Sequence, residues 1–126
     1  MDQVDLATRQ AAILRLKNII QGYWTIREGK ANRISLQDRK IIKENLIEAF
    51  IFQKKEIIRV QLLQCLAAVT KGDFPQQWPE LVPCIVKNLR SSDTSRVYGG
   101  LCALRIAFKR FQSETFALLL PRYMFF

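Results

Sequence analysis

Apolar residues recur every three or four positions along most of the chain, which is the spacing of one face of an α-helix. Residues 5–23 follow this pattern, with Ile13, Leu16 and Ile20 on one face and Lys17 on another. No segment alternates between apolar and polar residues in the manner of a half-buried strand, so we expect an all-α fold. The predicted helices are residues 5–23, 36–50, 55–71, 78–90, 95–111 and 114–121.

Residues near the helix ends support these boundaries. Ser35 and Asp38 form a variant of the capping box at the start of the second predicted helix. Gly72 fits a left-handed C-terminal cap of the third helix. Thr94 or Ser95 can cap the fifth helix.

Two of the predicted helices divide clearly into faces. The second is expected to bury the stripe Ile42, Leu46, Ala49 and Phe50. The fifth is expected to bury the stripe Val97, Leu101, Leu104, Phe108 and Phe111. The pair Gly99-Gly100 lies inside the fifth helix, and we expect it to allow close helix packing rather than to cradle a phosphate.

Alternate helices start at similar intervals, roughly 40–50 residues apart, which is the period of HEAT and armadillo repeats. Counted from Arg9 and Arg59, the first and third helices carry apolar residues at the same positions. Any two amphipathic helices can align in this way, which is the alternative explanation. We expect residues 1–126 to form a single domain, a right-handed α-solenoid of about three HEAT-like helix pairs (an armadillo-like α-α superhelix).

The stretch DFPQQWPELVP carries three prolines, a Phe and a Trp between strongly helical segments. Pro79 fits the first turn of the fourth helix, where its missing N–H costs little. Pro83 comes one turn later and is expected to bend that helix. We expect a buried corner between repeats rather than an exposed binding epitope. The residues of this corner are Phe74, Trp78, Pro79 and Leu81.

The chain has a formal net charge of +9, from 20 Lys and Arg against 11 Asp and Glu. Such an excess favours acidic partners, which include nucleic acid, anionic membranes and acidic proteins. The basic residues are spread along the sequence without a run of five or six like charges. Nucleic-acid binding is therefore not the favoured interpretation.

The commonest general base and the common catalytic motifs are missing. The chain has no histidine and no phosphate-binding or nucleophile-elbow motif. Cys65, Cys84 and Cys102 are far apart and form no C-x-x-C, which fits free thiols in the cytosol or nucleus. The start MDQVDLATRQ lacks the apolar core of a signal peptide, and no apolar tract is long enough to cross a membrane. We expect no enzyme activity, no metal site and no cofactor.

Four stretches, taken in order, resemble landmarks of the importin-β family of nuclear transport receptors, the karyopherins. They are RQAAILRLKNIIQGYW, IRVQLLQCLAAVTKGDFP, DFPQQWPELVP and VYGGLCALRIAFKRF. The ordered set is most similar to the N-terminal HEAT repeats of the importin seven and importin eight type. The resemblance covers about residues 5–112, most of the chain.

The resemblance implies a role in protein import into the nucleus and shuttling between cytoplasm and nucleus. In this family the N-terminal repeats bind the GTP-bound form of the small GTPase Ran, largely through the second helix of each pair. Ran binding then releases import cargo. The implied partners are Ran, import cargo proteins and nucleoporins, and they include neither nucleic acid nor a membrane.

Helical periodicity places candidate binding residues on the open faces of the helices that correspond to the Ran-binding ones. On the first helix these are Lys40, Lys43, Glu44, Ile47 and Glu48, and on the second Glu80, Cys84, Lys87 and Asn88. Ile47 stands out because an exposed isoleucine on a charged face can anchor a partner. A solvated face with one stray apolar residue explains the pattern equally well.

Two departures from the family pattern leave alternatives open. The family's N-terminal domain normally begins one helix pair earlier. The apolar end TFALLLPRYMFF indicates either a solenoid cut off in mid-stack or one that continues against another molecule. One alternative is a generic HEAT-like scaffold that binds proteins without binding Ran. The other is a truncated, non-functional isoform.

Overall fold

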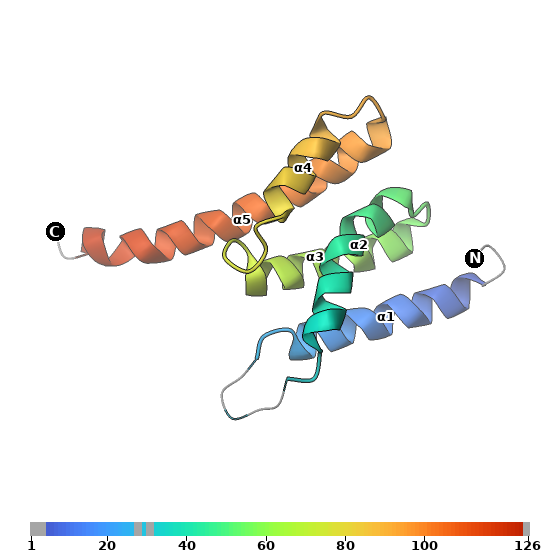
Figure 1. Cartoon of the computed structure of the whole chain (residues 1–126), viewed down its shortest axis with the longest axis horizontal. Coiled ribbons are helices and arrows are strands. Elements are labelled where there is room, and N and C mark those ends of the chain that lie inside the picture. The colour runs from blue at the N-terminus through green and yellow to red at the C-terminus, as the bar shows by residue number, and fades with distance from the viewer. Residues whose placement is uncertain (1–4, 27–28, 30–31, 125–126) are drawn as a thin grey trace.

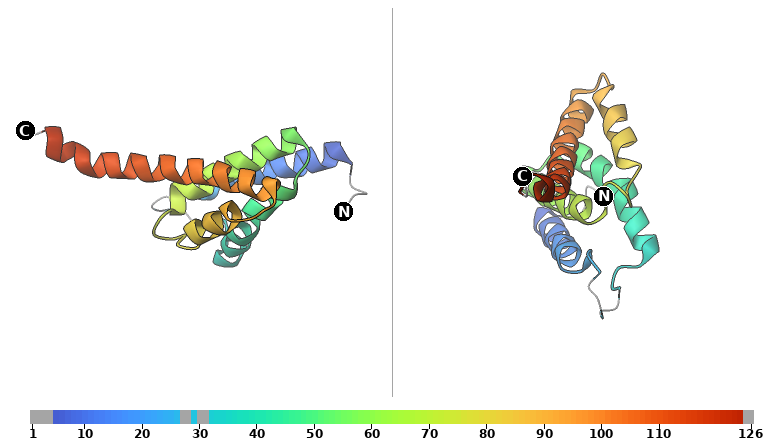
Figure 2. Two further views of the ribbon diagram at one scale, coloured as in Figure 1. Left: turned by 90° about the horizontal axis from the view of Figure 1, so that it is seen from above. Right: turned by 90° about the vertical axis from the view of Figure 1, so that its left-hand side faces the viewer.

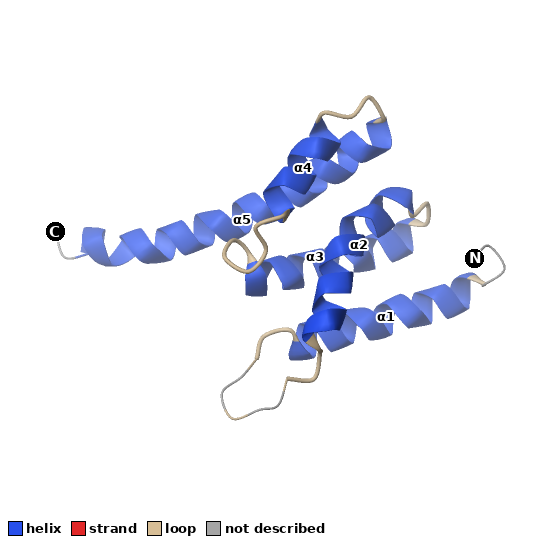
Figure 3. Ribbon diagram, viewed as in Figure 1, coloured by secondary structure: helices blue, strands red, loops and turns tan. Residues whose placement is uncertain are grey.

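The computed structural model describes residues 5–26, 29 and 32–124, and over these residues the chain is helical without a strand (Figures 1 and 3). The helices are α1 (Leu6–Tyr23), α2 (Leu36–Phe52), α3 (Glu56–Asp73), α4 (Leu81–Leu89) and α5 (Thr94–Met124). The predicted all-α class is confirmed. The predicted start of the fourth helix at residue 78 is three residues too early.

The helices form two layers, seen most clearly end-on in Figure 2, right. In one layer α3 packs between α1 and α5, and α2 and α4 lie on the other side. α2 packs against α3 and α5, and α4 packs against α5, whereas α2 and α4 make no close backbone approach to each other. This stacking is consistent with the expected HEAT-like α-solenoid.

One apolar core joins the layers. Its most deeply buried side chains include Ile20 from α1, Cys65 and Val69 from α3, and Leu81 and Ile85 from α4. Burial of an aliphatic side chain of this size stabilises a fold by about 1.5–3 kcal/mol. Because successive helices share the core, each pair depends on its neighbours for stability.

α5 is one continuous helix in place of the two predicted over residues 95–111 and 114–121. Gln112 and Ser113 join those segments, and neither is a Gly or Pro that would end a helix. The prediction of a separate sixth helix is therefore wrong. In the described residues, one long helix takes the place of the third pair (Figure 1).

The face of α5 that packs is not the predicted stripe. Val97 is half-buried, but Leu101, Leu104, Phe108 and Phe111 are exposed. α5 instead buries its small residues Gly99, Gly100, Ala103 and Ala107. A Cβ at Gly99 would lie 2.5 Å from Cγ1 of Ile51 on α2, so the helices can approach this closely only with glycine there. The predicted packing role of Gly99-Gly100 is confirmed.

The helix caps are partly as predicted. The Asp38 N–H donates to Ser35 Oγ at 3.1 Å, which confirms the side-chain cap of α2. α5 is capped by Asp93 rather than by Thr94 or Ser95. The Ser95 N–H donates to Asp93 Oδ1 at 2.9 Å, because Asp93 is the residue that directly precedes the first turn.

Gly72 does not form the predicted left-handed cap of α3. The helix continues through Asp73, and among the described residues only Gly29 has a positive φ. A Cβ at Gly72 would lie 2.7 Å from Cδ1 of Trp24, the residue after α1. Glycine at this position lets α3 lie directly against the indole ring.

The corner between α3 and α4 is buried as predicted. Phe74, Trp78 and Leu81 are 7%, 3% and 1% exposed, whereas Pro79 is exposed and lies before the helix. Pro83 belongs to the first turn of α4, where a backbone N–H has no acceptor within the helix. Pro83 therefore does not force α4 to bend, whereas a bend was expected from the sequence.

Candidate functional site

A groove with a volume of about 770 Å³ lies between α2 and α4. Its lining comes from α2, from residues 73–80, from α4, and from Ile26 after α1. It brings together most of the predicted binding residues, namely Lys40, Lys43, Glu44, Ile47, Glu80 and Cys84. Glu48, Lys87 and Asn88 do not line it.

The exposed lining of the groove mixes charge with apolar surface. Lys40, Glu44 and Glu80 are exposed, and the Lys40 Nζ lies 3.9 Å from Glu44 Oε1. An ion pair this exposed contributes at most about 0.5 kcal/mol, so these charges remain available to a partner. Leu36 and Ile26, which are 79% and 57% exposed, supply the apolar part.

Ile47 is not the exposed anchor that the sequence predicted, because it is only 4% exposed. α2 packs against α3 and α5 at once, so its buried face is wider than a single stripe. That face includes Leu46 and Phe50, as predicted, and also Ile47 and Ile51. Leu36, at the start of the same helix, is the more exposed of the two large exposed apolar side chains that line the groove, Leu36 and Ile26.

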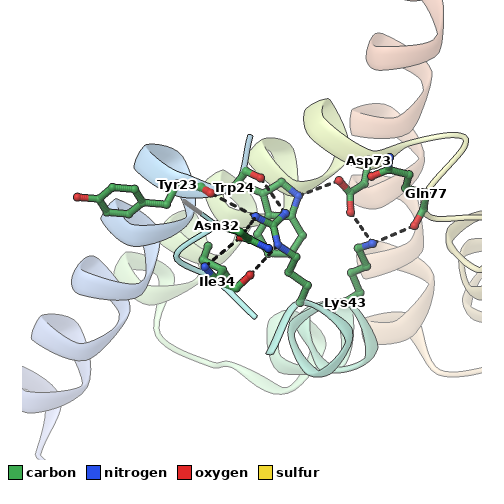
Figure 4. A network of polar contacts seen from close by, with 8 residues as sticks. Tyr23, Trp24, Asn32, Ile34, Lys43, Asp73 and Gln77 are labelled. Atoms are coloured by element: carbon green, nitrogen blue, oxygen red, sulfur yellow. Dashed lines mark hydrogen bonds and ion pairs between the residues drawn. The ribbon is translucent and has the colours of Figure 1, made fainter. Parts of the chain in front are cut away.

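Lys43 is half-buried, and a network of polar contacts holds its ammonium group (Figure 4). The Trp24 Nε1–H donates to Asp73 Oδ1 at 3.0 Å, and the other Asp73 oxygen forms an ion pair with Lys43. Lys43 Nζ also donates to the Gln77 carbonyl at 2.9 Å. The network ties the end of α1 and the middle of α2 to the end of α3.

Arg39 extends this network and is itself buried. Its guanidinium donates to the Trp24 carbonyl at 2.7 Å, to the Ile34 carbonyl at 3.1 Å and to Asn32 Oδ1 at 3.0 Å. It also lies 4.6 Å from the centre of the Trp24 ring, within cation–π range. A buried guanidinium with this many acceptors ties Trp24, which follows α1, to Asn32 and Ile34, which precede α2.

Arg39 is not among the predicted binding residues, although its position in the sequence indicates that it is buried. Arg39 lies three, seven and eleven residues before Ile42, Leu46 and Phe50, on the stripe predicted for the core. A charged residue on such a stripe needs buried partners. The partners are loop carbonyls, which periodicity does not reveal.

Two further predicted binding residues, Glu48 and Asn88, hold helices together. Arg96 on α5 donates to both carboxylate oxygens of Glu48, at 2.7 and 3.2 Å, and to Asn88 Oδ1 at 3.3 Å. Asn88 is 2% exposed and donates to the Cys84 carbonyl at 2.9 Å. The prediction that Asn88 lies on the open face is therefore wrong, and Glu48 is half-buried in the contact between α2 and α5.

The thiols of Cys65 and Cys84 are poorly suited to nucleophilic chemistry. Burial, reinforced by the nearby Glu48 carboxylate, raises the pKa of Cys84. Burial raises the pKa of Cys65 to about 11. A nucleophilic cysteine needs the opposite shift.

Neither a metal centre nor a membrane span is found in the part of the chain that the structure describes. Its His, Cys, Asp and Glu residues form no group of three or more that would hold a metal ion. None of its helices combines the length and apolar character needed to cross a bilayer.

Comparison with known proteins matches residues 1–51 to the family model of the importin-beta N-terminal domain. Importin-8 of Homo sapiens is 38% identical over 109 residues, which is 82% of this chain and 10% of that protein. The chain belongs to the importin-β family. No solved structure matches it.

Other members of the importin-β family show similar identity. The importin beta-like SAD2 homolog of Arabidopsis thaliana is 36% identical over 88% of this chain and 10% of that protein. Exportin-2 of Oreochromis niloticus is 34% identical over 87% of this chain and 11% of that protein. The chain thus spans about a tenth of the length of these relatives.

Membership of the importin-β family places the groove in context. Its α2 wall, with Arg39 and Lys43, falls within the residues that match the importin-beta N-terminal domain. Members of the family are nuclear transport receptors rather than enzymes.

Proposed function

We propose that the groove between α2 and α4 binds the GTP-bound form of Ran, and that the chain takes part in protein import into the nucleus. The observation that carries this proposal is that the groove forms between the two helices of the second layer, with its α2 wall inside the importin-beta N-terminal match. The resemblance implies that these helices correspond to the Ran-binding helices of the family.

The chemistry of the groove suits a protein partner. Exposed charges of both signs, Lys40, Glu44 and Glu80, stand beside the exposed side chains of Leu36 and Ile26. Protein interfaces typically combine an apolar centre with a polar rim, and a few apolar or aromatic anchors carry most of the affinity. In this account Leu36 is the anchor and the charges set the orientation.

The rest of the function follows from Ran binding. Import cargo proteins and nucleoporins are the further partners, and the chain shuttles between cytoplasm and nucleus. Lys87 is exposed on α4 outside the groove lining, so its contribution is limited to the edge of the interface.

The test is nucleotide-dependent binding of the whole chain to Ran. The chain should bind Ran loaded with a non-hydrolysable GTP analogue and not Ran loaded with GDP. Leu36→Asp should weaken binding by about tenfold or more. Ile57→Asp is the matched control, because Ile57 is 54% exposed at the start of α3 and does not line the groove.

Equal or absent binding in both nucleotide states would contradict the Ran proposal. Binding of other proteins with no preference for Ran-GTP would instead support the generic scaffold considered from the sequence. A chain without a cooperative thermal transition would support the non-functional isoform.

A further inference from the structure

A second groove lies between α3 and α5, with a volume of about 550 Å³. Its α3 side is formed by Val60, Leu63 and Ala67, among others. The buried residues Leu62 and Val69 point to the opposite side of that helix. Figure 2 shows α1, α3 and α5 in one layer, with α2 and α4 on the other side. The side of α3 that carries the groove residues therefore faces away from α2 and α4.

The charged residues that line this groove are all basic. Lys71, Arg105, Lys109 and Arg110 line it, and no acidic residue does. Between residues 57 and 72 of α3, and between residues 94 and 112 of α5, the sequence has no Asp or Glu at all. The walls of the groove thus supply four cations without an internal counter-charge.

These cations are also unpaired within the described part of the chain, where the ion pairs involve other basic residues. The Arg110 Nε is enclosed, and among the described residues it finds no hydrogen-bond acceptor. An enclosed donor without an acceptor is destabilising, because it has lost its hydrogen bond to water. A ligand that brings an acceptor would remove this cost.

The space between the cations is apolar. Val60, Leu63 and Ile106 line it, and no aromatic side chain does. A surface for single-stranded nucleic acid typically offers aromatic rings on which bases stack. An apolar groove edged by cations instead matches apolar side chains flanked by carboxylates.

From this complementarity we infer that the groove between α3 and α5 is a docking site for an acidic amphipathic peptide segment of a partner protein. Leucine- or phenylalanine-sized side chains occupy the space between Leu63 and Ile106. Asp or Glu residues on either side pair with Arg105, Lys109 and Arg110. The site is independent of the Ran proposal, because it lies on the other layer of helices.

The test is a fluorescence-anisotropy titration of the full chain with a fluorescein-labelled peptide of sequence EELFEELFEE. Two control peptides separate charge from apolar contact: KKLFKKLFKK reverses the charge, and EEAAEEAAEE removes the apolar side chains. The acidic amphipathic peptide should bind about tenfold or more tightly than either control. Equal binding of EEAAEEAAEE would show only general attraction to a basic protein and would overturn the proposal.

Substitutions then locate the site. The double variant Arg105→Glu and Lys109→Glu should lower affinity by about tenfold or more, and the milder Arg105→Gln and Lys109→Gln should lower it in the same direction. Lys54→Glu and Lys55→Glu form the matched control, because both residues are exposed in the turn between α2 and α3. An affinity unchanged by the groove variants, in chains with an unchanged thermal transition, would overturn the proposal.

Rival occupants are tested in the same assay. A labelled oligothymidylate and vesicles containing phosphatidylserine should bind more weakly than the peptide, and should not displace it at equal concentration of charge. Displacement by either would assign the groove to nucleic acid or to an anionic membrane instead.

Discussion

The indole N–H of Trp24 donates a hydrogen bond to Asp73 Oδ1 at 3.0 Å across 49 positions of sequence, and both side chains are buried. This contact joins the end of α1 to the end of α3. It also fixes Asp73 so that its other oxygen faces Lys43, beside the groove between α2 and α4. The geometry of the groove thus depends on residues outside its own two helices.

Trp24→Phe should destabilise the fold by about 1–3 kcal/mol, because it leaves a buried carboxylate oxygen without its donor. The measurement is urea denaturation followed by circular dichroism. Tyr23→Phe is the control, since Tyr23 is 43% exposed and should change stability little. A Trp24→Phe variant as stable as the parent would mean that this hydrogen bond does not form.

Two glycine-to-alanine substitutions should differ in their effect on the free energy of unfolding. Gly72→Ala should destabilise by about 1–3 kcal/mol, because the new Cβ would lie 2.7 Å from Trp24 Cδ1. Gly22→Ala, inside α1, should be neutral or stabilise by up to about 1 kcal/mol, because a Cβ there meets nothing within 4 Å. The measurement is thermal unfolding of both variants. A stabilising Gly72→Ala would contradict the close packing of Gly72 against Trp24.

Two large aromatic residues, Trp78 and Phe108, should contribute very differently to the free energy of unfolding. Trp78→Ala should cost about 3–5 kcal/mol, because Trp78 is 3% exposed in the corner between repeats. Phe108→Ala should cost under about 1 kcal/mol, because Phe108 is 61% exposed on α5. The measurement is chemical denaturation of the two variants under the same conditions. A larger loss of stability for Phe108→Ala than for Trp78→Ala would mean that the stripe predicted for α5 is buried after all.

Stability should fall with pH above the ordinary range of a thiol. Burial raises the pKa of Cys65 to about 11, so the folded state keeps a proton that the unfolded state loses near pH 9. The contribution is fully present below that pH and is lost as pH rises through about 11. Cys65→Ala should make the free energy of unfolding depend less on pH in this range. An unchanged dependence would mean that other groups cause the loss of stability.

Much of the fold could be predicted because helix formation is local. Periodicity placed α1, α2 and α3 to within about two residues, and the corner with Phe74 and Trp78 is buried as expected. The packing of α5 could not be found this way. Gly99 lies against Ile51 of α2, and Gly100 lies against Asn88 and Leu89 of α4. This packing depends on the shape of the neighbouring helices, and the larger residues Leu104 and Phe108 remain exposed.

The candidate site was predicted less well for a related reason. Lys40, Glu44 and Glu80 do line the groove, since one exposed face of a helix follows from periodicity. Ile47 is buried because α2 has two neighbours, which a helical wheel with a single buried face cannot represent.

The most direct test of the central claim is hydrogen exchange of the chain with and without Ran bound to a GTP analogue. If the groove is the binding surface, amides in residues 36–44 and 77–84 should be protected by Ran-GTP and not by Ran-GDP. The outer layer of α1, α3 and α5 should exchange at the same rate in both cases. Protection confined to that outer layer, or identical exchange in the two nucleotide states, would contradict the account.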